Sequence, residues 1–201
     1  QCFPISQKLK NFKRKKIKYQ KIKNILVFIS GTDPFNVSFK IANFLKDKIF
    51  KQYKIKIILN KIANYINFKK CLKISNESKN IKILTFKESG YFKLLKWSDI
   101  NIFGEGSAMI ESIYARKKTL VIKFFNNSYS NFKFLKYLKK RNIINYFDIN
   151  NGDKRKFIET FFNTQNTKSN NRSLKNDLFF RSAEQKFNLN NIIFQTLKHE
   201  L

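Results

Sequence analysis

The chain has 201 residues, a length that suits one domain with a hydrophobic core of its own, and its two cysteines exclude a disulfide-built scaffold. Its 42 Lys and Arg against 13 Asp and Glu give a formal net charge of +29, which ordinarily indicates nucleic-acid or anionic-membrane binding. Because the basic residues are spread throughout, and Lys, Asn, Ile and Phe are abundant together as in proteins of A+T-rich genomes, we interpret most of them as a solvated surface.

The leading segment, residues 1–23, contains Pro4 and a basic run over residues 8–23 with little periodicity. We interpret it as a basic linker that precedes the fold. The run is also dense enough for peripheral contact with an acidic membrane surface. The sequence has no run of about 18 apolar residues for a membrane span and no leading apolar stretch for a signal peptide, so we expect a cytoplasmic protein. Because Gln1 rather than Met begins it, the chain is also interpreted as a possible fragment.

The first element of the fold is a continuous apolar run at residues 24–29, which is typical of a strand covered on both faces. The sequence Ser-Gly-Thr-Asp-Pro at 30–34 ends it. We expect Asp33 to be the N-cap of the following helix and Pro34 its first residue, because a carboxylate can accept an orphan amide bond and proline needs no donor there. That helix is predicted to end near Phe50.

The remaining sequence continues the alternation of strands and helices. Further strands are predicted at 54–59, 80–86, 99–103, 119–124 and 143–147, and helices at 61–72, 91–97, 107–115, 131–140, 154–162, 174–186 and 189–197. Parallel neighbouring strands need a crossover connection, so this order predicts an α/β fold, a Rossmann-like parallel sheet flanked by helices. We divide the chain into the leading segment 1–23, the α/β domain 24–150, and a helical tail 151–201 that packs on this domain or extends from it.

Two small-residue turns at the carboxyl ends of strands are candidates for a phosphate site, because ligands of such sheets bind at that edge. Gly106 and Ser107 open a helix, and its free amides and positive dipole end suit an anion. Gly31 and Thr32 offer the same before the first helix. Glu111 follows Ser107 by four residues, so both side chains share a helix face where the carboxylate can accept from ribose hydroxyls.

Other common site types are not predicted by the sequence. Residues 104–106 form a Gly-x-Gly, but they lack the third glycine of a dinucleotide fingerprint and follow the fourth predicted strand instead of the first. The P-loop pattern is absent, and His199, the only histidine, lies two residues from the end. The cysteines have no metal-ligand spacing. The sequence therefore predicts no metal, no cofactor and no specific catalytic residue.

Two stretches resemble a known family, the C-terminal half of GT-B nucleotide-sugar enzymes. ILVFISGTDPFNVSFKIANFL is similar to the family's strand, Gly-Gly-Ser-Asp-Pro loop and helix. SDINIFGEGSAMIESIYARKKTLVIKFFNNSYSN is similar to its second signature, with a Gly-Gly-Ser-Thr turn, a Glu on the helix and an Asp-Asn-Gln loop. The likeness covers roughly residues 1–150. It is closest to the UDP-sugar hydrolases of the pseudaminic acid pathway (spore-coat polysaccharide type) and more distant from the MurG glycosyltransferases.

The resemblance implies a site residue by residue. The first loop corresponds to Gly31, Thr32 and Asp33, the uridine and ribose site to Gly106, Ser107 and Glu111, and the diphosphate or sugar loop to Asn127, Ser128 and Asn131. Ser128 stands where the family has Gln, and Glu105 stands where it has the leading Gly of the second turn. A carboxylate at Glu105 repels a diphosphate unless its side chain turns away.

The implied function is binding of a UDP-sugar by one half of a hydrolase or glycosyltransferase of surface-polysaccharide or nonulosonic acid biosynthesis. The resemblance implies that the hydrolase's catalytic histidine belongs to an N-terminal half, present in the same chain or as a separate subunit. Two alternatives stay open at this stage: a degenerate, non-catalytic GT-B subunit and a basic nucleic-acid-binding module. The scattered lysines and the lack of a recognition motif argue against the second, so no specific nucleic acid is expected.

Overall fold

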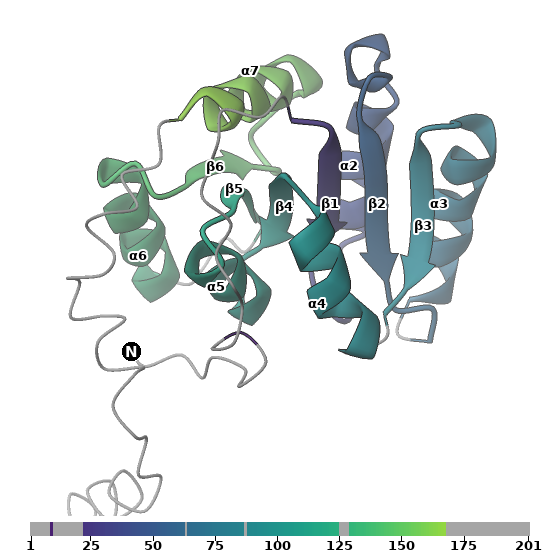
Figure 1. Cartoon of the computed structure of the whole chain (residues 1–201), viewed down its shortest axis with the longest axis horizontal. Helices are drawn as coiled ribbons and strands as arrows, with labels where there is room; N and C mark the ends of the chain where they lie inside the picture. The colour runs from purple at the N-terminus through teal and green to yellow at the C-terminus, as the bar shows by residue number, and fades with distance from the viewer. Residues whose placement is uncertain (1–8, 10–21, 63, 87, 125–128, 168–201) are drawn as a thin grey trace, which may run out of the picture.

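The computed structural model describes residues 9, 22–62, 64–86, 88–124 and 129–167, and their strands form one parallel sheet (Figure 1). The strand order is β3-β2-β1-β4-β5-β6, and every neighbouring pair is parallel. The strands are β1 (Asn24–Phe28), β2 (Lys54–Leu59), β3 (Ile81–Thr85), β4 (Ile100–Gly104), β5 (Lys118–Lys123) and β6 (Asn145–Asp148). The predicted Rossmann-like parallel α/β fold is confirmed.

Helices cover both faces of the sheet, which is why its central strands are continuous apolar runs. One face packs against α2 (Val37–Leu45), α3 (Tyr65–Glu77) and α7 (Lys154–Asn166), and the other against α4 (Glu88–Trp97), α5 (Ser107–Tyr114) and α6 (Tyr129–Lys140). Alternate strand residues divide between the two cores: in β5, Leu120 belongs to the first core and Val121 to the second. Figure 1 shows α4 and α5 in front of the sheet and α2 and α3 behind it.

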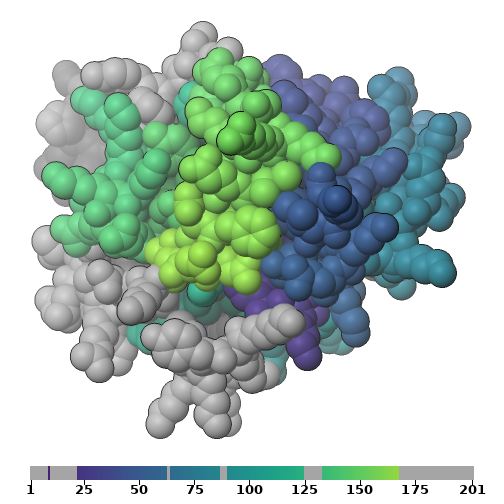
Figure 2. Space-filling view, turned by 90° about the horizontal axis from the view of Figure 1, so that it is seen from above, coloured from purple at the N-terminus to yellow at the C-terminus, as the bar shows by residue number. Residues whose placement is uncertain are grey.

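Helix α7 packs into the core on the same face of the sheet as α2 and α3. Phe157 and Phe161 are fully buried and pack against other aromatic rings of that face. Its polar side chains reach the α2–β2 connection, where Lys154 Nζ lies 2.6 Å from the Asp47 carboxylate and the Tyr53 hydroxyl bonds to a side chain of α7. Figure 2 shows the surface of α7 against that connection, which contains the short helix η1 (Lys48–Phe50). The helices predicted at 174–186 and 189–197 lie outside the described residues.

Several predicted helix boundaries are wrong. Helix α2 begins at Val37 instead of Pro34 because Asp33 and Asn36 have positive φ angles of 43° and 52°, which a helix excludes. It ends at residue 45, and the turn of η1 follows it. Helix α3 covers 65–77 instead of 61–72, and α4 begins three residues earlier than predicted. Helix α6 begins at Tyr129, two residues before the predicted start at 131.

Helix α3 has a capping residue that the hydrophobic pattern does not reveal. Asn64 is its N-cap, and the Asn64 side chain accepts a hydrogen bond from the backbone N–H of Asn67 at 3.0 Å. Ile62, which falls in the predicted helix 61–72, precedes α3 and is 95% exposed. The side-chain amide of Asn64 also donates to the carbonyl of Asp33 at 2.9 Å. The start of α3 therefore supports the loop that follows β1.

Candidate functional site

The carboxyl ends of β1 and β4 lie side by side at the centre of the sheet, where the strand order reverses. From β1 the chain continues to β2 on one side, and from β4 it continues to β5 on the other. Such a switch point is where open α/β sheets bind ligands. A Cβ atom on Gly104 would lie 2.0 Å from the carbonyl oxygen of Ile29, so only glycine allows this approach of the two strand ends. The structure thus brings the two predicted glycine turns together.

The loop after β1 is built around Asp33, which is 3% exposed. Its carboxylate accepts hydrogen bonds from the backbone N–H groups of Val37 and Ser38, both at 2.9 Å, and from the Asn67 side-chain amide at 2.6 Å. The Asp33 backbone N–H donates to the Ser30 hydroxyl at 2.7 Å. The predicted N-cap assignment is wrong in position, because the N-cap is residue 36, but a carboxylate does cap this helix.

This arrangement has a consequence for anion binding at the first loop. The N-terminal amides of α2 that would hold a phosphate are already bound to a protein carboxylate. Gly31 and Thr32 are exposed at the outer part of the loop, whereas Asp33 points inward. Within the predicted site, Gly31 and Thr32 are therefore open to a ligand, and Asp33 holds the loop in place.

The N-terminus of α5 differs from that of α2. Its N-cap is Gly106, with an extended backbone (φ 175°), and within the described part of the chain no side chain caps this helix. Ser107 is the first helical residue and is exposed, and among the described residues no atom beyond its neighbours along the chain lies within 4 Å of where a Cβ on Gly106 would be. Backbone amides and the positive end of the helix dipole are consequently available to an anion at the switch point.

Glu111 lies one turn into α5 and faces helix α4. It is partly buried, and burial raises the pKa of its carboxyl, while the Tyr91 hydroxyl beside it lowers this pKa in part. Tyr91 is 5% exposed, and burial followed by the Glu111 charge raises the pKa of its phenol. The pair places a carboxylate and a phenol together beside the α5 start. Tyr91 was not predictable from the sequence, because only the fold brings α4 against this part of α5.

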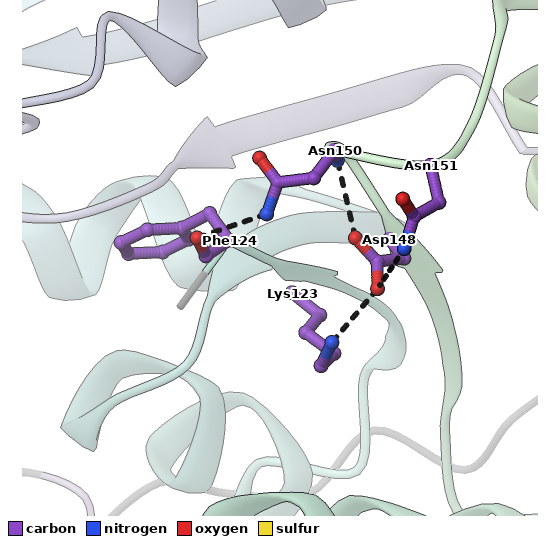
Figure 3. Close-up of polar contacts among 5 residues, drawn as sticks. All are labelled: Lys123, Phe124, Asp148, Asn150 and Asn151. Carbon is purple, nitrogen blue, oxygen red and sulfur yellow. Dashed lines mark hydrogen bonds and ion pairs between the residues drawn. The ribbon is translucent and has the colours of Figure 1, made fainter. Parts of the chain in front are cut away.

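A second group of polar side chains lies at the ends of β5 and β6 (Figure 3). Lys123 Nζ is 2.7 Å from Asp148 Oδ2, and this carboxylate also accepts the backbone N–H of Asn150 at 3.1 Å. The Asn150 side-chain amide donates to the Phe124 carbonyl at 3.2 Å. Figure 3 shows the Lys123 and Asp148 side chains meeting, with Asn150 and Asn151 also bonded to the Asp148 carboxylate. This group is not among the predicted site residues either, although a charged residue near the end of each of two consecutive predicted strands was a usable signal.

The third predicted loop is described only in part. Asn127 and Ser128 lie outside the described residues, and Asn131 lies in the first turn of α6, with its side chain likewise outside the description. Among the described residues, no cluster of three or more His, Cys, Asp or Glu side chains could hold a metal ion. None of the helices in the described ranges is long and apolar enough to cross a membrane.

The fold is shared with known glycosyltransferase structures. Acinetobacter baumannii MurG superimposes with a TM-score of 0.55 at 15% identity, over 73% of this chain and 43% of that protein. WaaG, a glycosyltransferase involved in lipopolysaccharide biosynthesis, gives 0.51 at 11% identity, over 84% of this chain and 44% of that protein. The glycotransferase of kitacinnamycin gives 0.57 at 11% identity, over 87% and 42% respectively.

These likenesses show that the described sheet and helices form one half of a GT-B glycosyltransferase-like fold. The chain spans less than half the length of each of the three structures. No protein-family model and no curated protein matches the sequence.

Proposed function

We propose that this chain is the nucleotide-sugar-binding half of a two-part GT-B enzyme, and that it binds a UDP-sugar at the switch point between β1 and β4. One observation carries the proposal. The uncapped N-terminus of α5 lies at that point with a partly buried carboxylate, Glu111, one turn along the helix. A ribose diphosphate requires an anion site for its phosphates and, beside it, a group that accepts hydrogen bonds from the ribose hydroxyls.

The chemistry follows from the placement of these groups. The diphosphate lies against the amides that follow Gly106, with the Ser107 hydroxyl as a further donor, and the ribose hydroxyls donate to Glu111. Gly31 and Thr32 border the same anion from the first loop. Because these amide dipoles are fixed before the reaction, they stabilise the charge that develops on the leaving UDP. The sugar carbon is then attacked by water in a hydrolase or by an acceptor hydroxyl in a transferase.

Exposed apolar residues at the same edge of the sheet support a second half that covers the site. They follow β1, β2 and β3 and are Phe35 (61% exposed), Ile62 (95%), Tyr65 (50%), Ile66 (66%) and Phe86 (42%). Large exposed apolar side chains gathered at one edge are typical of interaction surfaces. The solved structures with this fold are more than twice as long as the portion that this chain matches. We propose that the other half, in the same chain or as a separate subunit, docks here and supplies the catalytic base.

The finer assignment within the fold is also a proposal. The first-loop and second-turn signatures favour the UDP-sugar hydrolases of the pseudaminic acid pathway, with a role in surface-polysaccharide or nonulosonic acid biosynthesis. Product analysis separates the two reactions. A hydrolase releases UDP and free sugar from the complete protein without an acceptor, whereas a transferase releases UDP at an appreciable rate only when an acceptor is present.

Calorimetry with UDP tests the site on the full chain and on the chain combined with its other half. We expect Glu111→Ala to weaken UDP binding by about tenfold or more, because a hydrogen bond to a charged group is worth roughly 1.5–3 kcal/mol. Glu159→Ala, on the exposed side of α7, is the matched control and leaves the affinity unchanged. Equal UDP affinity in both variants would refute the site. Binding of any polyanion with a steep salt dependence would instead favour a nucleic-acid module.

A further inference from the structure

Three charged side chains follow one another across the carboxyl ends of β4, β5 and β6. Lys123 and Asp148 are register partners in neighbouring strands and form the 2.7 Å ion pair, with side chains only 15% and 23% exposed. The last register pair between β4 and β5 is Gly104 with Ile122, so Glu105, the residue that follows β4, lies opposite Lys123. The result is a row of negative, positive and negative groups, the Glu105–Lys123–Asp148 row.

The row has an unused acceptor. Glu105 Oε1 is buried and has no hydrogen-bond partner among the described residues. Burial raises the pKa of the Glu105 carboxyl, the Lys123 charge and the backbone N–H of Phe124 lower it, and Asp148 raises it again. With two carboxylates and one ammonium, the row is net negative when all three groups are ionised. A buried acceptor without a partner is costly, and because Glu105 as a whole is only partly buried, a turn of its carboxylate lets a donor on a ligand remove that cost.

The position of the row decides which part of a ligand can supply that donor. Glu105 immediately precedes Gly106, the N-cap of α5, so it lies directly beside the proposed diphosphate. Glu111, with a tyrosine of α4, lies on one side of that helix start, and Lys123 and Asp148 of β5 and β6 lie on the other. In a nucleotide sugar the diphosphate connects the ribose to the sugar. With the ribose on the α4 side, the sugar extends toward β5 and β6.

We propose that the Glu105–Lys123–Asp148 row selects the sugar: Glu105 accepts a hydrogen bond from a sugar hydroxyl, and the net negative row rejects sugars that carry a carboxylate. The inference rests on the proposed UDP-sugar site and adds its substrate class, which is neutral or amino-bearing sugars. Glu105, which stands in a glycine-rich turn, is then a residue that contacts the sugar. In this proposal its carboxylate, which is within the electrostatic influence of Lys123, contacts the sugar and not the diphosphate.

Titration of the full chain, alone and combined with its other half, with UDP, UDP-glucose and UDP-glucuronate tests the proposal. We expect the wild-type protein to bind UDP-glucose at least about tenfold more tightly than UDP-glucuronate, since an unpaired like charge in a partly buried site is strongly disfavoured. Glu105→Gln preserves the side-chain shape but removes the charge, so we expect it to reduce the ratio of UDP-glucose affinity to UDP-glucuronate affinity severalfold. The affinity for UDP itself stays the same or rises. Glu159→Gln is the matched control and changes neither.

A second variant acts on the same row from its other end. Asp148→Asn removes one of the two negative charges and leaves the row neutral when Glu105 is ionised, so UDP-glucuronate gains affinity relative to UDP-glucose. Thermal unfolding of each variant establishes that it is folded. An unchanged ratio in both variants, with UDP still bound and still sensitive to Glu111→Ala, overturns this inference alone. Failure of the wild-type chain, with its other half, to bind UDP overturns the proposed function and the inference with it.

Discussion

The strongest stability prediction concerns Asp33, because one buried carboxylate joins the loop after β1, the start of α2 and helix α3. Replacing it with alanine removes the acceptor for two backbone N–H groups and for the Asn67 amide. Loss of a helix cap costs about 1 kcal/mol and up to about 2, and leaving a buried polar group unsatisfied costs roughly 1–3 kcal/mol. We therefore expect Asp33→Ala to lower the free energy of unfolding by about 2–5 kcal/mol.

Two further variants separate the causes of this loss. Asp33 has a φ of 43°, which asparagine and glycine tolerate better than alanine does. Asp33→Asn keeps the side-chain shape and one acceptor oxygen, so we expect it to cost less than alanine, about 1–2 kcal/mol. Asp33→Gly removes the acceptor without the backbone strain, and its difference from alanine measures that strain, about 1 kcal/mol.

Urea unfolding followed by circular dichroism measures each variant, and a double-mutant cycle with Asn67→Ala isolates the bond between α3 and the loop. We expect a coupling energy of about 1–3 kcal/mol, because the Asn67 amide and the Asp33 carboxylate are 2.6 Å apart in a buried site. A loss below about 1 kcal/mol for Asp33→Ala, or additive effects in the cycle, would refute the view that this carboxylate organises the loop.

The other predictions each concern one group near the site or its core. Gly104→Ala places a Cβ 2.0 Å from a backbone oxygen at the end of β1 and should cost about 3 kcal/mol in urea unfolding, whereas Gly106→Ala meets nothing within 4 Å and should cost less than about 1 kcal/mol. The pKa of Glu105 is raised in the fold, so near this pKa the folded state binds more protons than the unfolded state does. The free energy of unfolding therefore falls as the pH rises above about 4.5 toward the folded pKa. In urea unfolding measured across pH, Glu105→Gln should show a smaller fall in this free energy than the wild-type protein. Burial raises the pKa of Cys71 to about 12, so in a Cys2→Ser background a thiol reagent at a pH of about 8 should label the chain only after denaturation; labelling of the native protein would contradict this.

The strands were predictable because their burial on both faces leaves a continuous apolar signal in the sequence. The predicted range 54–59 coincides with β2, and the other strands differ by a residue or two at their ends. Helix starts were less predictable because they depend on backbone conformations that apolar periodicity does not encode. Asp33-Pro34 has the composition of a helix start, yet the left-handed conformations of Asp33 and Asn36 delay the helix to Val37.

The site was predictable where it depends on a short stretch of chain, and not where it depends on contacts between elements. The start of α5 at Ser107 follows from its glycine turn, and the face that Glu111 shares with it follows from helical spacing. Tyr91 and Lys123 come from other elements, and their positions are set by how α4 and β5 pack. No local pattern in the sequence specifies the Tyr91 contact, whereas the only local signal for Lys123 is that it and Asp148 are charged residues near the ends of two consecutive predicted strands.

The two glycine turns have similar sequences, but the helices that follow them differ in whether their N-terminal backbone N–H groups are free to bind a ligand. At α2, Asp33 already occupies the N-terminal amides, so that turn contributes exposed groups at its outer part only. At α5, Gly106 supplies no side chain, and the helix start is open. Two equivalent anion sites would suit a ligand with separated phosphates. One open helix start, with Glu111 on one side and the Glu105–Lys123–Asp148 row on the other, is what the proposed site for a single diphosphate between a ribose and an uncharged sugar requires.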